Sequence, residues 1–248
     1  MTAFSYQLWS SRNFPPLTET LKLLASLGYV QVEGFGGMFT DPSGVNELEA
    51  ALKASGLSMP TAHLPLQMVE DDPDRVIAIA RRLGLQKVFI PYLVAEDRPA
   101  DAAGWRDFGA RLQAAGEPLR AAGLGFGWHN HDFEFAPLPD GTIPMEAILA
   151  GGPDLEWEAD IAWIVRGGGD PFDWIARHGR RITAAHVKDI APAGMNTHED
   201  GWADPGHGTL DWPALIAALD NTNCQFFVME HDNPDDHHRF ASRAIAAF

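Results

Sequence analysis

Short apolar runs alternate along this chain with longer segments in which apolar residues recur every three or four positions. The runs predict strands at 4–9, 30–33, 58–63, 87–92, 124–129, 155–160, 182–187 and 225–230. The segments that follow them predict helices near 17–27, 45–55, 73–83, 104–122, 144–150, 171–178, 211–219 and 236–247. These eight strand–helix units are the number that a closed parallel barrel needs.

The predicted helix boundaries carry the residues that such boundaries favour. Glycine follows four of the helices, where a left-handed residue commonly ends a helix, at Gly28, Gly56, Gly84 and Gly123. An open, doubly wound sheet is the alternative architecture, and it would want a glycine-rich phosphate loop after the first strand. The segment SSRNFPP at that place has no glycine. We therefore predict an α/β fold, with one (β/α)8 TIM-barrel domain over residues 1–248.

Composition and charge narrow the range of partners. The chain is 46% apolar and carries a formal net charge of −16, which disfavours nucleic acid and anionic membrane as partners. One cysteine, Cys224, excludes an intramolecular disulfide and is expected to be a small buried residue. The N-terminal residues do not resemble a signal peptide, and we see no run long enough to span a bilayer. A cytoplasmic location is the resulting expectation.

Several predicted strands end in a residue that can bind a metal or move a proton. Side chains at strand ends on one rim of a barrel converge on one point. Without a bound cation, burying such a set of ionisable side chains would cost free energy of folding, because the side chains lose hydration and repel one another. Carboxylate and imidazole ligands without thiolate suit one divalent ion, which could be Mn²⁺, Mg²⁺, Co²⁺ or Zn²⁺. These strand-end residues are His63, His129, Asp160, His186 and Glu230.

Neighbouring polar residues have a second interpretation. Glu156 and Glu158 share a strand face with Asp160, and Lys188 shares one with His186. An ion pair between these glutamates and Lys188 or an arginine inside the barrel is as well supported as a direct role in the site. The stretch from about Asp189 to Thr209 is predicted to be a long functional loop on the active rim.

Motifs spread over the full length resemble those of the sugar phosphate isomerase/epimerase family of xylose-isomerase-like barrels. That resemblance implies a divalent metal held by acids and a histidine of strands 5 to 8. Asp160, His186 and Glu230 match three of the ligands. The fourth is Glu134 or His129, and we prefer Glu134 because hard cations favour carboxylate. The motifs are QLWSSR (7–12), GYVQVEGFG (28–36), WHNHDFEF (128–135), EADIAW (158–163), HVKDI (186–190), GHGTLDW (206–212) and VMEHDNP (228–234).

The same resemblance implies an enzyme of carbohydrate metabolism that isomerises or epimerises a small keto-sugar or sugar derivative. The reaction would remove an α-proton and pass through an enediolate, with Glu134 and Glu230 exchanging the roles of base and acid. Predicted substrate-binding residues are His63, His129, His131, Lys188, Glu33 and Trp163, whereas Trp9 could equally belong to the core.

Other functions remain possible at this point. A lyase of the same family, acting like an inosose dehydratase or cleaving 3-keto-glycosides, begins with the same proton abstraction. A nuclease related to endonuclease IV is disfavoured by the net charge of −16. A metal-free binding protein on the same barrel is a further alternative, and a homo-oligomer is expected from the resemblance alone.

Overall fold

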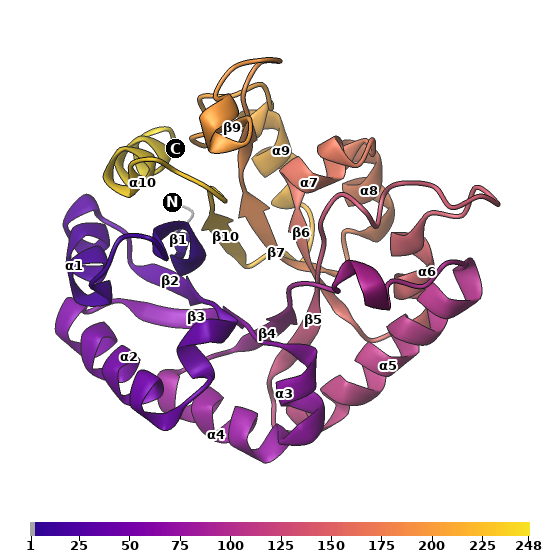
Figure 1. Cartoon of the computed structure of the whole chain (residues 1–248), viewed down its shortest axis with the longest axis horizontal. Helices are drawn as coiled ribbons and strands as arrows, with labels where there is room; N and C mark the ends of the chain where they lie inside the picture. Colours follow the sequence, from indigo (N-terminus) through magenta and orange to yellow (C-terminus); the bar gives the residue numbers. More distant parts are fainter. Residues whose placement is uncertain (1–2) are drawn as a thin grey trace.

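The computed structural model describes residues 3–248 and shows a closed parallel barrel surrounded by helices (Figure 1). All the predicted barrel strands form, with bounds within two residues of those predicted, and they confirm the fold class. The order around the barrel is β1, β10, β7, β6, β5, β4, β3 and β2. The strands are β1 (Phe4–Gln7), β2 (Gln31–Gly34), β3 (Ser58–His63), β4 (Lys87–Ile90), β5 (Gly125–His129), β6 (Glu156–Asp160), β7 (Ile182–Val187) and β10 (Phe226–Met229).

The predicted helices also form, and shorter ones join them. Those expected from the apolar periodicity are α1 (Leu17–Leu27), α2 (Pro42–Ser55), α4 (Pro73–Leu83), α5 (Ala102–Ala121), α6 (Pro144–Gly151), α8 (Pro171–His178), α9 (Trp212–Leu219) and α10 (His237–Ala246). The shorter ones, which the sequence did not indicate, are α3 (Leu66–Asp71) and α7 (Ile161–Arg166), with 3-10 turns η1 (Leu8–Ser11), η2 (Gly36–Phe39), η3 (Ala95–Asp97) and η4 (Thr197–Glu199).

Capping residues explain where several helices begin and end. Asp72 precedes α4 and its carboxylate accepts a hydrogen bond from the backbone N–H of Arg75, which satisfies a free donor of the first turn. Asp170 caps α8 in the same way through the N–H of Phe172. Gly28 after α1 has a left-handed φ of 96°, as its place at the helix end predicts.

The inside of the barrel changes from apolar to polar along the strands. A small buried cluster of Phe89, Ala184, Phe226 and Val228 fills its lower part. His186 lies two residues beyond Ala184 on the same strand face, and Glu230 lies two residues beyond Val228. The carboxyl ends of the strands therefore carry the polar residues above an apolar base.

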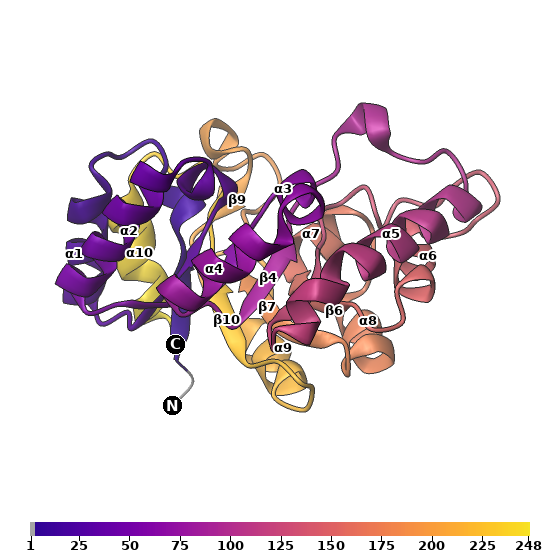
Figure 2. The same ribbon diagram turned by 90° about the horizontal axis from the view of Figure 1, so that it is seen from below.

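The segment predicted as a long loop is partly ordered as a hairpin. Strand β8 (Asp189–Ile190) pairs antiparallel with β9 (Trp202–Ala203), so the prediction of an irregular stretch was wrong in this part. The Asp189 carboxylate accepts hydrogen bonds from the backbone N–H groups of Ile190, Gly206, Gly208 and Leu210, which ties the segment together. The hairpin lies at the end of the barrel opposite the chain termini (Figure 2).

Among residues 3–248, no helix has the length and apolar character needed to cross a membrane.

Candidate active site

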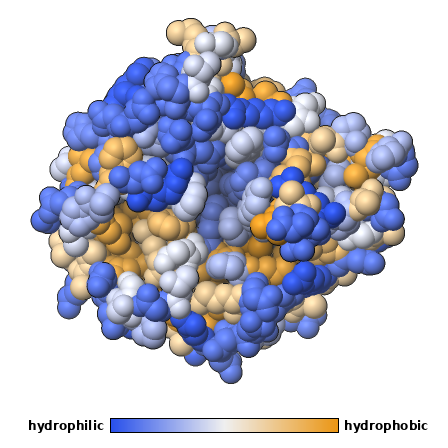
Figure 3. Space-filling view, viewed as in Figure 1, coloured by the Kyte–Doolittle hydropathy of each residue, from blue (hydrophilic) through white to orange (hydrophobic). Residues whose placement is uncertain are grey.

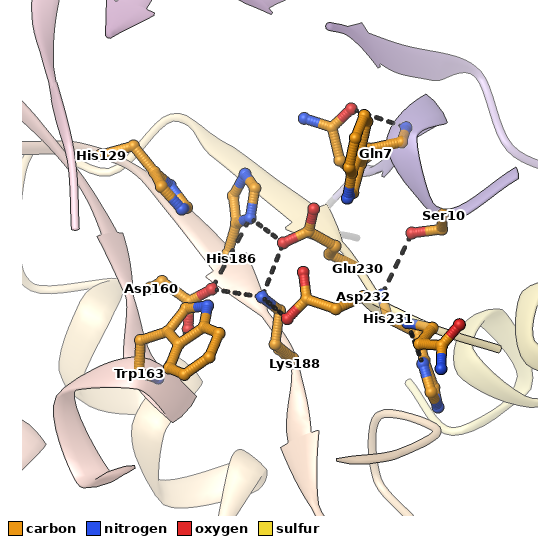
Figure 4. A network of polar contacts seen from close by, with 12 residues as sticks. Gln7, Ser10, His129, Asp160, Trp163, His186, Lys188, Glu230, His231 and Asp232 are labelled. Atoms are coloured by element: carbon orange, nitrogen blue, oxygen red, sulfur yellow. Dashed lines mark hydrogen bonds and ion pairs between the residues drawn. The ribbon is translucent and has the colours of Figure 1, made fainter. Parts of the chain in front are cut away.

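A buried cluster of opposite charges lies at the carboxyl ends of β6, β7 and β10 (Figure 4). The Lys188 ammonium lies 2.9 Å from Asp160 Oδ2, 2.8 Å from Glu230 Oε2 and 2.9 Å from Asp232 Oδ2. His186 Nδ1 lies 2.9 Å from the same Glu230 oxygen. We call these five residues the acid group. Three carboxylates face one ammonium and the His186 ring. Burial would lower the pKa of His186, but Glu158 and Glu230 raise it well above its ordinary value, so with this ring protonated the group has an excess of one negative charge.

Local structure fixes Asp160 so that its two oxygens face different partners. Its Oδ1 accepts a hydrogen bond of 2.9 Å from the N–H of Trp163 and thereby caps α7. The side chain of Asn130 holds the Asp160 backbone, accepting from its N–H at 3.0 Å and donating to its carbonyl at 3.1 Å. The other oxygen, Oδ2, is buried and makes no hydrogen bond, although it contacts the Lys188 ammonium. The Lys188 ammonium, at 2.9 Å, is therefore the cation that this oxygen contacts in the structure.

Histidines form a second cluster on the other side of His186. His63 Nε2 lies 2.5 Å from Glu158 Oε2, and His129 Nδ1 lies 3.1 Å from the same atom. His186 Nε2 lies 2.8 Å from Glu33 Oε1, which also accepts a hydrogen bond of 2.7 Å from Gln7. We call Glu33, His63, His129 and Glu158 the imidazole group. His186 joins the two groups, because each of its ring nitrogens faces one of them.

Burial and mutual contact determine the charges of the acid group. Burial alone would lower the pKa of Lys188, but the carboxylates of Asp160, Asp232 and Glu230 raise it. Burial would raise the pKa of Glu230, whereas Lys188 and His186 hold it well below its ordinary value. Burial raises the pKa of Asp232 to about 6, an effect that Lys188 only partly offsets. Glu230 is therefore an ionised carboxylate inside the protein.

The imidazole group divides into charged and neutral members. Burial would lower the pKa of His63, but Glu33 and Glu158 raise it. Burial, together with the nearby His186, lowers the pKa of His129 to about 4, so this ring stays neutral at physiological pH. Burial opposes the charge of Glu158, whose pKa His186 and His63 nevertheless hold well below the ordinary value.

Two sets of side chains have the spacing of metal ligands. Asp160, His186 and Glu230 offer ligand atoms within 4.8 Å of one another, and so do His63, His129, Glu158 and His186. A divalent ion with bonds of about 2.0–2.2 Å can lie between atoms spaced in this way. Each set has a buried carboxylate oxygen without a hydrogen bond, Asp160 Oδ2 in the first and Glu158 Oε1 in the second, and each combines the oxygen and nitrogen ligands that divalent ions accept. The first set belongs to the acid group, in which three carboxylates face one ammonium and one imidazole. These residues fit a divalent cation.

Glu134 lies outside both sets. Its Oε1 accepts a hydrogen bond of 2.9 Å from the indole N–H of Trp128, and its Oε2 accepts one of 2.9 Å from the backbone N–H of His131. The side chain is buried, and burial raises its pKa to about 8, against the effect of those hydrogen bonds. The structure therefore does not bring Glu134 together with Asp160, His186 and Glu230.

Two other expectations are corrected by the contacts. Glu156 forms an ion pair with Lys87 at 2.8 Å, and Glu158 contacts histidines, so neither glutamate pairs with Lys188 as one interpretation suggested. The alternation of side chains along β6 correctly predicted that Glu158 shares the inner face of the strand with Asp160. The sequence could not show its partners, because His63 and His129 come from distant parts of the chain.

A cavity of about 480 Å³ opens above the acid group at the barrel mouth (Figure 3). Four of the predicted site residues line it, namely His63, His129, His131 and Glu230. The residues Glu33, Glu134, Asp160, Trp163, His186 and Lys188 are not among those that line it. The remaining lining residues are Trp9, Phe35, Gly36, Gly37, Pro91, Tyr92 and Asp232. Phe35 and Tyr92 each follow the end of a barrel strand. That position in the sequence could have indicated that they line the cavity.

Comparisons with known proteins agree with this architecture. A family model described as xylose isomerase-like TIM barrel matches residues 21–247. The rhizopine catabolism protein MocC of Rhizobium meliloti is 20% identical over 250 residues, which cover 86% of this chain and 75% of that protein.

Solved structures show the same fold at low sequence identity. A sugar phosphate isomerase/epimerase from Parabacteroides distasonis has a TM-score of 0.82 and 19% identity, and the match covers 98% of this chain and 92% of that one. The IOLI protein, whose crystal structure has a binding zinc atom, has a TM-score of 0.72 and 16% identity, with 99% and 95% of the two chains covered.

Proposed function

Because the chain belongs to the xylose isomerase-like TIM barrel family, we propose that it is a divalent-metal-dependent isomerase or epimerase. Its substrate would be a small keto-sugar or a sugar derivative. The observation that carries this proposal is the acid group, a buried set of acids with excess negative charge directly beneath a cavity at the barrel mouth. Active sites of this fold lie at that end of the barrel.

Asp160, His186 and Glu230 would hold the ion, through Asp160 Oδ2, His186 Nδ1 and Glu230 Oε2. A bound dication would act as a Lewis acid that stabilises negative charge developing on a substrate oxygen. It would also offset the excess negative charge of the acid group. Mn²⁺, Mg²⁺, Co²⁺ and Zn²⁺ all suit these ligands, and the zinc of the IOLI protein supports a metal in this family.

Glu230 is the best-placed base for the α-proton of the substrate. It lines the cavity, and the contacts with Lys188 and His186 keep it ionised and fixed in direction. Glu134, which the family resemblance suggests as its partner, has both oxygens hydrogen-bonded outside the cavity lining. His131 is the better candidate for the second proton carrier, because it lines the cavity and its buried Nδ1 has no hydrogen-bond partner.

The remaining polar residues would orient the substrate. His63 and His129 line the cavity and are held by the Glu158 carboxylate, so their rings are fixed before a ligand arrives. Lys188 would act indirectly, by holding the carboxylates of Asp160 and Glu230 in place.

Proton exchange in deuterated water tests this function without knowledge of the natural substrate. The purified protein, loaded with Mn²⁺, would be incubated with D-fructose, D-allulose or 3-keto-D-glucose and followed by NMR. We expect deuterium to enter at a carbon next to the carbonyl and the exchange to stop when EDTA is added. Glu230→Gln should lower the exchange rate by about 100-fold or more, because it removes both the proposed base and one of the proposed metal ligands.

Glu146→Gln is the matched control, since Glu146 pairs with Arg177 on the surface and should leave exchange unchanged. Exchange by Glu230→Gln at the rate of the unsubstituted protein would remove Glu230 as the base. The product mass separates the two reaction classes: an isomerase conserves it, whereas loss of water or of an aglycone would identify a lyase.

A further inference from the structure

The cavity has an acidic floor and an aromatic rim. Glu230 and Asp232 are the acids of the lining, and among the lining residues there is neither lysine nor arginine. Figure 3 shows hydrophilic residues deep in the central hollow of this face. At the mouth, away from the proposed metal and from His63, a phosphate or carboxylate on the ligand would meet neither lysine nor arginine, which disfavours an anionic group there.

The cations near this surface are already engaged. Lys188 is enclosed by three carboxylates and is fully buried. Arg12 donates to the carbonyls of Trp9 and Asp232 at 2.9 and 2.7 Å, and its guanidinium lies 4.1 Å from the centre of the Trp9 ring. Arg98 donates to the Tyr92 hydroxyl at 2.8 Å. Both arginines therefore support rim aromatics from outside the cavity lining.

Two aromatic walls stand on either side of β3. Trp9 packs edge-on against Phe35 with ring centres 5.3 Å apart, beyond the ends of β1 and β2. Tyr92 packs edge-on against His131 at 5.0 Å, beyond the ends of β4 and β5. Trp9 is 40% exposed and Tyr92 is 49% exposed, although both line a concave site. Exposed aromatic faces of this kind commonly cover the apolar face of a ligand.

The volume indicates a ligand larger than one sugar. At 480 Å³ the cavity lies in the range of about 300–1,000 Å³ that is typical for drug-sized ligands, whereas a hexose has only about a dozen non-hydrogen atoms. One sugar ring placed over Glu230 and the histidines would leave the aromatic rim uncovered.

We propose that the cavity takes an uncharged glycoside with two ring units. The reacting ring lies over Glu230, and the second ring lies at the mouth between Trp9 and Tyr92. This inference rests on the proposed function for the identity of the reacting ring. The second ring is recognised by stacking and by exclusion of water, so it can be a sugar or an aromatic aglycone.

Binding measurements on the metal-loaded protein test the second-ring site. The probes are the 3-keto derivatives of methyl β-D-glucopyranoside, phenyl β-D-glucopyranoside and cellobiose, with glucose 6-phosphate as the anionic probe. We expect the two-ring probes to bind about 10-fold more tightly than the methyl glucoside, and glucose 6-phosphate to bind more weakly than any of them. Trp9→Ala and Tyr92→Ala should each reduce the two-ring advantage to about 3-fold or less and leave the affinity for the methyl glucoside nearly unchanged.

Phe172→Ala is the matched control, because Phe172 is 43% exposed on α8 and does not line the cavity. Equal affinity for one-ring and two-ring probes, or the tightest binding by glucose 6-phosphate, would overturn the inference. The readout does not depend on turnover. A preference for two-ring probes without deuterium exchange would therefore contradict the proposed reaction and support the second-ring site. Deuterium exchange without that preference would support the proposed reaction and contradict the second-ring site.

Discussion

Lys188 is the residue on which the arrangement of the acid group depends. It is fully buried and contacts three carboxylates, of which Glu230 is the proposed base. Removing one partner from a buried ion cluster leaves the others without compensation. Lys188→Met should therefore lower the free energy of unfolding by about 3–5 kcal/mol, measured by urea denaturation in EDTA. Adding Asp232→Asn should recover part of the loss, because it removes one of the unpaired charges.

Lys22→Met serves as the control for this substitution. Lys22 forms an exposed pair with Glu19, and such pairs contribute at most about 1 kcal/mol. If Lys188→Met were as stable as Lys22→Met, the carboxylates around Lys188 would not need the ammonium.

At the scale of single residues, the sequence indicated which side chains point into the barrel but not which side chains pair with one another. Strand alternation placed Asp160, His186 and Glu230 on the inner face, and the structure brings their ligand atoms within 4.8 Å. Glu134 could not be placed in this way, since it lies beyond the end of β5 and its direction is set by Trp128 and the backbone of His131. The contacts of Lys188 with three acids from two other strands likewise depend on tertiary structure.

At the scale of elements, periodicity and capping residues predicted every barrel strand and every helix of eight residues or more. The two helices that were missed, α3 and α7, have six residues each, which is too short for a helical period to repeat. The β8–β9 hairpin was missed because each strand has only two residues, which is too short for an alternating apolar pattern to appear.

The contact between α5 and α6 is close enough to require glycine. A Cβ atom at Gly109 would collide with the backbone carbonyl oxygen of Ile148, which cannot move as a flexible side chain can. Alanine at a free position inside a helix would stabilise it by about 1 kcal/mol. Gly109→Ala should instead lower the free energy of unfolding by about 1–3 kcal/mol, because the helices must separate. Urea denaturation gives the sign, and a stabilising effect would show that the two helices are not in close contact here.

At the scale of the whole molecule, the barrel brings distant segments together at one mouth. The acid group comes from β6, β7 and β10 and the residues that follow them, and the imidazole group adds β2, β3 and β5. The eight strand–helix units were sufficient to predict this convergence, because parallel strands in a closed barrel end on the same rim. The net charge of −16 is consistent with an acidic mouth but did not by itself locate it.

Anomalous diffraction from crystals soaked in Mn²⁺ tests the central claim most directly. We expect one strong peak within about 2.0–2.4 Å of Asp160 Oδ2, His186 Nδ1 and Glu230 Oε2, and its loss in crystals of Asp160→Ala that keep the same fold. A peak bound by His63, His129 and Glu158 instead, or no peak at the barrel mouth, would contradict the account.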